Sequence, residues 1–167
     1  MKREAGEVLA TVALGSNLGN PVGELDRALV KLGELPRTRV VARSSWHETE
    51  PVGGPAGQPR FRNGVVQLAT ALGARELLAE LQRLEREAGR VRAHEVRNGP
   101  RILDLDLIFH GDARVNEPEL ELPHPRAEER LFVLEPLAEI APQMQLPGCR
   151  KSVRERVREL RSMRTGA

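Results

Sequence analysis

The chain has 167 residues, of which 40% are hydrophobic, and its formal net charge at pH 7 is +2. This length is enough to bury one substantial core, so we expect a single domain over residues 1–167. No apolar run approaches the roughly 18 residues that a membrane helix needs. The polar start of the chain is unlike a secretory signal, so we expect a cytoplasmic protein with no membrane partner. The single cysteine, Cys149, cannot form an internal disulfide.

Arginine dominates the basic residues, since only Lys2, Lys31 and Lys151 of the 26 basic residues are lysines. Arginine is well suited to clamp phosphate groups, although genome composition or selection for heat stability explains such an excess equally well. Aromatic residues make up only 2% of the chain, so there is no row of rings on which single-stranded bases could stack. Composition therefore argues against a nucleic-acid partner, and nothing in it implies an obligate protein partner.

The first half of the chain predicts three strands and one helix. Val8 to Leu14 is a short apolar run that ends at a Gly-Ser-Asn turn, as a buried strand does. Asn20 suits a helix N-cap and Pro21 the first helical position, and leucines at helical spacing continue to about Leu35. The segments that follow are a second strand (Thr38 to Trp46), a loop rich in Gly and Pro (Glu50 to Pro59) and a third strand (Asn63 to Leu72).

The second half begins with a helix that has leucines on one face and Arg or Glu on the other, and that ends near Gly89. An arginine-rich connection leads to a fourth strand over Ile102 to Phe109. A helical stretch covers about Leu131 to Ile140, and a last helix begins near Ser152, which has capping-box spacing to Glu155. The order strand, helix, strand, strand, helix, strand is typical of a ferredoxin-like α+β sheet, here with C-terminal helical additions, so one face of the sheet should carry both crossover helices.

The fourth predicted strand places two carboxylates on one face of an otherwise apolar segment. Because side chains alternate along a strand, the core face holds Leu103, Leu105, Leu107 and Phe109, and the other face holds Ile102, Asp104, Asp106 and Ile108. The aspartates stand roughly 6 to 7 Å apart, close enough to chelate magnesium ions that hold phosphate oxygens. Acidic residues also occur on the wet face of an antiparallel sheet, but like charges flanked by isoleucines make a poor solvated surface, so the pair indicates a function.

Several other segments could complete such a site, and most also have an ordinary structural interpretation. Residues 15–20 lie between a strand and a helix, where backbone amides often bind phosphate, or they form a plain tight turn. The arginines of residues 90–101 form either a solvated basic loop or a lid over a magnesium-bound polyphosphate. Residues 123–126 add a histidine, and lone histidines are more often structural. Residues 48–53 and 58–63 offer a ring, an amide and backbone groups, which suit a flat heterocycle.

Five motifs occur in order along the chain: Ala13 to Gly19, Glu48 to Gly53, Gln58 to Asn63, Gly99 to Asp106, and Pro123 to Pro125 with Arg130 to Leu134. Together they resemble the 6-hydroxymethyl-7,8-dihydropterin pyrophosphokinase family of folate biosynthesis, over roughly residues 12–142. The resemblance implies a ferredoxin-like enzyme that transfers the terminal diphosphate of ATP to the hydroxymethyl group of the pterin. It also implies that AMP is released and that two magnesium ions are used.

The resemblance implies roles for individual residues. The expected metal ligands are Asp104 and Asp106, and the expected catalytic residues are these two with Arg90 and Arg92. The expected pterin-binding residues are Gly15, Thr49, Val52, Phe61, Asn63 and Phe132, with the two phenylalanines sandwiching the ring. The expected ATP-binding residues are Glu85, Arg90, Arg92, Arg101, His124 and Arg130. Since no side chain is an evident strong general base, catalysis is expected to come from positioning and electrostatics.

Two other classes of function stay open on these patterns. Another two-metal enzyme on a ferredoxin-like sheet, a nucleotidyl transferase or a cyclase, also pairs aspartates and would release pyrophosphate. A non-catalytic RNA-binding module driven by arginines would bind with a steep salt dependence and without magnesium.

Overall fold

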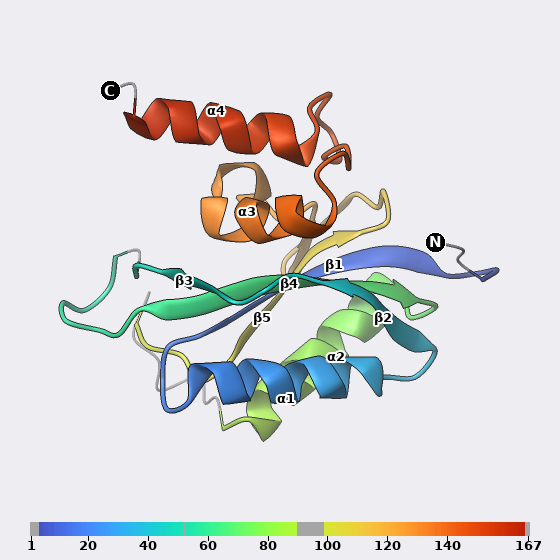
Figure 1. Cartoon of the computed structure of the whole chain (residues 1–167). Coiled ribbons are helices and arrows are strands. Elements are labelled where there is room, and N and C mark those ends of the chain that lie inside the picture. Colours follow the sequence, from blue (N-terminus) through green and yellow to red (C-terminus); the bar gives the residue numbers. More distant parts are fainter. Residues whose placement is uncertain (1–3, 52, 90–98, 166–167) are drawn as a thin grey trace.

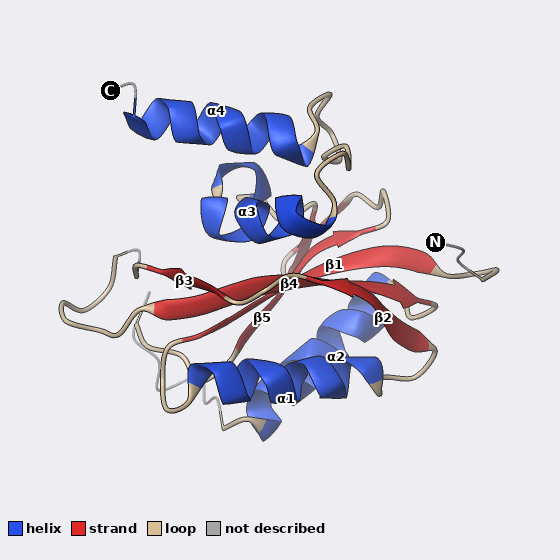
Figure 2. Cartoon of the chain, viewed as in Figure 1, coloured by secondary structure: helices blue, strands red, loops and turns tan. Residues whose placement is uncertain are grey.

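The computed structural model describes residues 4–51, 53–89 and 99–165. Figure 1 shows the elements in their spatial arrangement, and Figure 2 shows one sheet between two helical layers. The strands are β1 (Val8–Ser16), β2 (Thr38–Arg43), β3 (His47–Thr49), β4 (Phe61–Thr70), β5 (Asp104–His110), β6 (Val115–Glu117) and β7 (Leu120–Leu122). The helices are α1 (Pro21–Gly33), α2 (Ala74–Glu87), a 3-10 helix (Ala127–Glu129), α3 (Leu131–Ile140) and α4 (Val153–Thr165). Within the described part of the chain, no helix is long and apolar enough to cross a bilayer.

The main sheet has the strand order β2-β4-β1-β5, with antiparallel neighbours throughout, and β3 also pairs with β4. Helix α1 connects β1 to β2, and α2 connects β4 to β5, so the βαββαβ order and the ferredoxin-like α+β fold predicted from the sequence are confirmed. The hairpin of β6 and β7 lies between β5 and the 3-10 helix, where the sequence patterns predict no strand. The sequence signal there is weak because each of these strands has only three residues.

The segment predicted as one strand over Thr38 to Trp46 is broken into β2 and β3. Ser44 explains the break, because its hydroxyl accepts the Val65 N–H at 2.9 Å while its own N–H donates to the Val65 carbonyl, also at 2.9 Å. The serine hydroxyl thus takes the place of a backbone carbonyl in the ladder. The chain is then free to bend at Ser45 before it pairs with β4 again at His47.

Each face of the sheet has its own hydrophobic core. Leucines 103, 105 and 107 pack with alternate residues of β1 against α1 and α2, as predicted for the leucine face of β5. On the opposite face, α3 and α4 pack over Val65, Ile108 and Phe109. Figure 1 shows α1 and α2 below the sheet and α3 and α4 above it. The aspartates of β5 therefore face the layer of α3, beside the second core.

The prediction that Phe109 shares the face of the leucines is wrong. The register between β1 and β5 shifts, because Val12 is opposite Leu107 while Thr11 is opposite Phe109. Ile108 is the extra residue of a β-bulge, which places it and Phe109 together in the core under α3 and α4. A bulge cannot be read from alternation alone, since both neighbouring residues are apolar.

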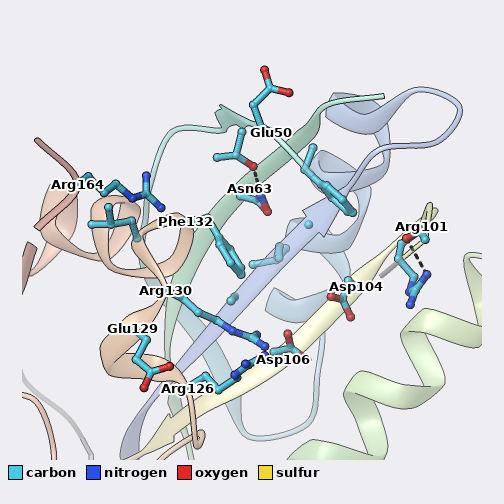
Figure 3. A pocket seen from close by; sticks show the side chains of 17 residues that line it. Glu50, Asn63, Arg101, Asp104, Asp106, Arg126, Glu129, Arg130, Phe132 and Arg164 are labelled. Carbon is cyan, nitrogen blue, oxygen red and sulfur yellow. Dashed lines mark hydrogen bonds between the residues drawn. The ribbon is translucent and has the colours of Figure 1, made fainter. Parts of the chain in front are cut away.

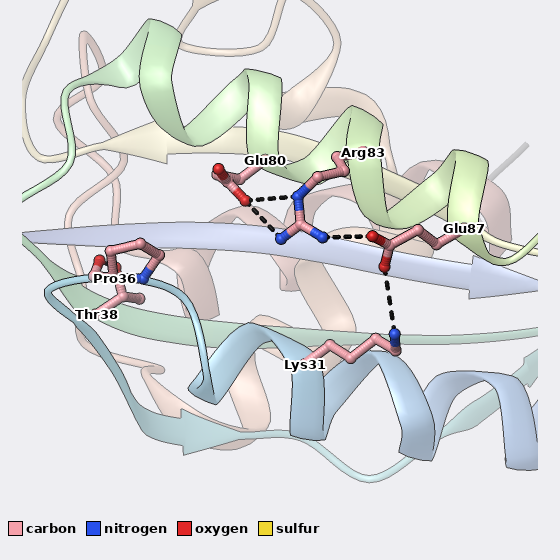
Figure 4. Close-up of polar contacts among 6 residues, drawn as sticks. All are labelled: Lys31, Pro36, Thr38, Glu80, Arg83 and Glu87. Carbon is pink, nitrogen blue, oxygen red and sulfur yellow. Dashed lines mark hydrogen bonds and ion pairs between the residues drawn. The ribbon is translucent and has the colours of Figure 1, made fainter.

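Helices α1 and α2 lie side by side and are joined by an exposed chain of charges (Figure 4). Arg83 donates to Glu80 and to Glu87 on its own helix, and Glu87 pairs with Lys31 of α1 at 3.3 Å. Ion pairs as exposed as these are screened by solvent and contribute little to stability. The packing of both helices therefore rests mainly on their buried leucines, while Asn20, as predicted, caps α1 by accepting the Gly23 N–H at 3.2 Å.

Gly64 on β4 offers a direct test of the packing at the broken strand. A Cβ at this position would lie 2.4 Å from Cε3 of Trp46 and 2.9 Å from the Ser44 hydroxyl. We expect Gly64→Ala to lower the free energy of unfolding by about 1–3 kcal/mol, as measured by urea denaturation, because the indole must shift. Gly33→Ala is the matched control, since its Cβ would meet Val40 at an ordinary 3.7 Å. Equal stabilities of the two variants would contradict this packing.

Candidate active site

A pocket of about 400 Å³ opens on the sheet face that α3 only partly covers (Figure 3). Its floor is formed by β1, β4 and β5, and its wall by the 3-10 helix and the first turn of α3. The lining residues are Ala13, Leu14, Gly15, Thr49, Glu50, Phe61, Asn63, Gly99, Arg101, Asp104, Asp106, Arg126, Glu129, Arg130, Leu131, Phe132 and Arg164. The structure thus brings together segments from almost the whole length of the chain.

The floor is a row of three residues on neighbouring strands. Gly15 on β1 is opposite Asn63 on β4 and opposite Asp104 on β5. A Cβ on Gly15 would lie 3.1 Å from the Asn63 Oδ1 atom and 3.8 Å from the Phe61 ring. The absence of a side chain at Gly15 therefore keeps the floor flat beside the amide and the aromatic ring.

One end of the pocket suits a flat, polar ring. Phe61 comes from the sheet and Phe132 from α3, so the two aromatic side chains enter the pocket from different layers. The Asn63 Nδ2 atom donates to the Thr49 hydroxyl at 2.9 Å, which orients an amide that is only 7% exposed. Five of the six residues predicted to bind the pterin are thus in one pocket, and the sixth, Val52, lies outside the described residues.

The other end of the pocket is charged. Asp104 and Asp106 are partly exposed and both line the cavity (Figure 3). Arg126 and Arg130, the residues on either side of the 3-10 helix, extend toward Asp106. Arg101 also lines the pocket, and its guanidinium donates to the Gly99 carbonyl at 2.7 Å. Carboxylates beside arginines suit a ligand that carries both phosphate oxygens and a divalent cation.

Asn17 joins three segments at the rim of the pocket. Its Nδ2 atom donates to the Gln58 Oε1 atom at 3.1 Å and to the Pro59 carbonyl at 3.0 Å. Its Oδ1 atom accepts the backbone N–H of Arg101 at 2.8 Å. The Asn17 N–H donates in turn to the Arg101 carbonyl at 3.0 Å. Because the side chain and the backbone N–H of Asn17 already have hydrogen-bond partners within the protein, the structure favours a tight turn at residues 15–20 over a phosphate-binding loop.

Glu85, predicted from the resemblance to contact ATP, has a structural contact here. Its side chain is buried under β5, and its carboxylate accepts the Leu105 N–H at 2.9 Å. Leu105 lies between Asp104 and Asp106, so Glu85 holds the backbone that carries both carboxylates. Glu85 is not among the residues that line the pocket, and its contact with ATP stays a prediction.

His124 lies next to the pocket and lines a smaller adjoining cavity. The backbone N–H of His124 donates to the Ile108 carbonyl at 2.9 Å, and the Nδ1 atom of its ring accepts the backbone N–H of Arg126 at 3.3 Å. Burial, together with the positive charges of Arg130 and Arg126, lowers the pKa of His124 to about 4 against the opposing effect of Asp104. The imidazole is therefore neutral at pH 7, and its predicted contact with ATP stays a prediction.

The sequence patterns missed several lining residues, and two predicted arginines are not placed. Arg90 and Arg92 lie outside the described residues. The sequence patterns assign no role to Arg126, although its spacing of four residues from Arg130 is a usable signal. Arg164, at the end of α4, had no such signal, because only the packing of α4 on α3 brings it to the pocket.

The pKa of His124 predicts how stability depends on pH. Since the folded-state pKa of about 4 lies below the ordinary value of 6.5, the unfolded chain binds the proton first as the pH falls. This contribution to stability is complete above pH 6.5 and is lost as the pH falls toward 4. We expect His124→Asn to lose less of its free energy of unfolding over this range than the unmodified protein, in urea denaturation at several pH values. Parallel curves for both proteins would contradict a buried neutral imidazole.

Comparisons with known proteins agree with this geometry. The family model for 7,8-dihydro-6-hydroxymethylpterin-pyrophosphokinase (HPPK) matches residues 11–142. A 2-amino-4-hydroxy-6-hydroxymethyldihydropteridine pyrophosphokinase of Pseudomonas aeruginosa is 48% identical over 136 residues, which are 81% of this chain and 82% of that protein. The enzyme of the same name from Haemophilus influenzae is 42% identical over 140 residues, which are 84% of this chain and 86% of that protein.

Solved structures support the fold. A crystal structure of Plasmodium falciparum HPPK-DHPS aligns with a TM-score of 0.76 at 15% identity and covers 99% of this chain. This chain corresponds to 47% of that longer chain, so the likeness concerns one part of it and shows the fold alone. With the family match over most of its length and relatives above 40% identity, the chain belongs to the 7,8-dihydro-6-hydroxymethylpterin-pyrophosphokinase family.

Proposed function

We propose that this protein transfers the terminal diphosphate of ATP to the hydroxymethyl group of 6-hydroxymethyl-7,8-dihydropterin and releases AMP, a step of tetrahydrofolate biosynthesis. Membership of the HPPK family supports this activity. The observation that carries the proposal is a single pocket with two different ends, one aromatic and amide-lined, the other formed by carboxylates and arginines. Such a pocket suits a flat heterocycle next to a polyphosphate, which is the pair of substrates that the reaction needs.

The aromatic end would hold the pterin. Phe61 and Phe132 would stack on the two faces of the ring, and Asn63, oriented by Thr49, would hydrogen-bond with its polar edge. Gly15 would leave the floor clear for the ring. Backbone groups near Val52, outside the described residues, would complete this end of the pocket.

The charged end would hold the triphosphate of ATP. Arg101 and Arg130 would bind phosphate oxygens from two sides of the floor, and we add Arg126, which lines the same end. Arg90, Arg92, Glu85 and His124 stay proposed ATP contacts from the resemblance. Because Arg126 and Arg130 flank the 3-10 helix just before α3, the packing of this layer on the sheet would bring positive charge to the phosphates.

Asp104 and Asp106 would hold magnesium, for which two ions are expected. The donor set fits, since Mg²⁺ prefers carboxylate oxygens and usually takes its other ligands from water and substrate phosphates. Among the described residues, no group of three His, Cys, Asp or Glu side chains could hold a metal ion. When bound, magnesium would neutralise the phosphate charge that develops during transfer.

In the reaction, the hydroxymethyl oxygen would form a bond to the β-phosphorus and lose its proton to solvent, while the bond from this phosphorus to the oxygen that stays with the α-phosphate breaks. The residues of this chain would act by holding the two substrates in line and by stabilising the charge on AMP as it leaves. No carboxylate or imidazole of the described pocket is placed as an evident general base. Arg90 and Arg92 stay proposed catalytic residues, together with the two aspartates.

The remaining predictions from the sequence are kept as part of this proposal. Residues 1–167 would form one domain, which agrees with two cores packed on one sheet. The partners would be the two small-molecule substrates, with no nucleic acid, membrane or obligate protein partner. The cytoplasmic location stays a prediction from the sequence.

The proposal is tested by analysing the products after the protein is mixed with ATP, magnesium and 6-hydroxymethyl-7,8-dihydropterin. We expect AMP and pterin diphosphate in equal amounts, only when all components are present, because the transferred group is the β,γ-diphosphate. Release of pyrophosphate without pterin would instead support a nucleotidyl transferase or a cyclase. Binding of RNA by a folded protein that shows no turnover would support a binding module.

The two aspartates provide a second test. We expect Asp104→Asn and Asp106→Asn each to reduce kcat by at least about 10²-fold, because each variant loses a carboxylate beside the phosphates. The fold should survive, since both side chains are partly exposed. Asp112→Asn is the matched control, an exposed aspartate just beyond the end of β5. Turnover near that of the control in either variant would refute the proposed role of that aspartate.

A further inference from the structure

Glu139, near the end of α3, binds the segment that connects β2 and β3. Its carboxylate accepts the Ser45 N–H, the Ser45 hydroxyl and the His47 Nε2 atom, each at 2.8 Å. These donors are more than 90 residues away in the sequence. One side chain of α3 therefore fastens both the bend in the chain and the first residue of β3.

The bend depends on this carboxylate for its hydrogen bonds. Ser44 completes the ladder with β4 through its hydroxyl, which leaves the Ser45 N–H pointing away from the sheet and toward α3. Partial burial by itself would raise the pKa of Glu139. The hydrogen bonds from His47 and Ser45 have a larger effect in the opposite direction, so the pKa lies below its ordinary value. The side chain is thus charged at neutral pH, and charged acceptors make stronger hydrogen bonds than neutral ones.

The two elements that Glu139 joins are two walls of the ring-binding end of the pocket. Strand β3 ends at Thr49, which lines the pocket and accepts the hydrogen bond from Asn63. Helix α3 begins with Leu131 and Phe132, which line the pocket from the other side. Strand β3 is only three residues long and, among the described strands, pairs with β4 alone, so few other described contacts set its distance from α3.

We propose that Glu139 is a positioning residue for pterin binding, which sets the separation between β3 and α3 and so the width of the slot for the ring. This inference rests on the proposed function, because it names the substrate whose binding depends on that width. Glu139 is not among the residues that line the pocket, and its carboxylate bonds to Ser45 and His47. Substitution of Glu139 should therefore weaken the binding of the pterin and not the binding of ATP.

A merely structural role would give a different result. The side chains of Glu139 and His47 are 39% and 29% exposed, and pairs this exposed contribute little to global stability because solvent screens them. If the role were only structural, loss of the contact would lower stability slightly and would change the KM values for the pterin and for ATP by the same factor. The separate KM values for the pterin and for ATP distinguish the two roles.

The experiment compares Glu139→Ala and Glu139→Gln with Glu135→Gln, in steady-state kinetics with each substrate varied in turn. Glu135 is the matched control, because it lies on the same helix but pairs with Arg161 of α4 at 3.5 Å. We expect Glu139→Ala to raise KM for the pterin about tenfold, with KM for ATP changed less than twofold. Glu139→Gln should restore part of the pterin affinity, because its amide oxygen still accepts the Ser45 N–H.

A double variant tests whether the effect passes through the contact itself. We expect Ser45→Ala alone to raise KM for the pterin by a smaller factor, because it removes one of the three donors. Added to Glu139→Ala, it should have no further effect, since contacting residues are not additive. Ser45→Ala also keeps the inference testable if Glu139→Ala does not fold.

The outcomes separate the two proposals. If the unmodified protein forms no pterin diphosphate, the proposed function fails. If it is active but Glu139→Ala and Ser45→Ala behave like Glu135→Gln, or raise both KM values equally, the role of Glu139 in positioning is refuted while the function stands. A selective rise in KM for the pterin that Glu139→Gln partly reverses supports the inference.

Discussion

The amide of Asn17 holds together the three segments that shape the open side of the pocket. Asn17 lies in the turn after β1, and its hydrogen bonds join this turn to the loop before β4 and to the segment before β5. A buried amide left without partners would cost about 1–3 kcal/mol per unmet bond, so the three segments are held in one arrangement. Arg101 therefore reaches the charged end of the pocket from a fixed backbone.

The two faces of strand β5 have different roles, because one carries leucines and the other carries aspartates. Its leucines fill the core above α1 and α2, which fixes the strand in the sheet, while its aspartates face the pocket. Glu85 satisfies the Leu105 N–H between them from below. The bulge at Ile108 then returns apolar side chains to the upper face, where they pack under α3 and α4. Strand β5 thus contributes the aspartates of the pocket floor and also apolar residues on which the layer of α3 and α4 packs.

The layer of α3 and α4 completes the site. It brings Phe132 to the aromatic end and Arg126 and Arg130 to the charged end, and it is fastened to β3 through Glu139. Neutral His124 adds no charge beside the arginines, which agrees with its burial. The two ends of the pocket differ because the aromatic rings and the Asn63 amide lie where β3 and α3 meet, whereas the charged side chains lie over β5.

The order of elements, the helix caps at Asn20 and Ser152 and the shared face of Asp104 and Asp106 follow from the sequence, because each depends on neighbours within a few residues. The motifs likewise indicated the family and most of the pocket. The bulge at Ile108, the break at Ser44 and the side-chain bonds of Asn17 and Glu139 do not follow from it. Their partners lie from about twenty to more than ninety residues away, so no local periodicity records them. Only the closing of the sheet and the packing of α3 upon it bring these groups within hydrogen-bond distance.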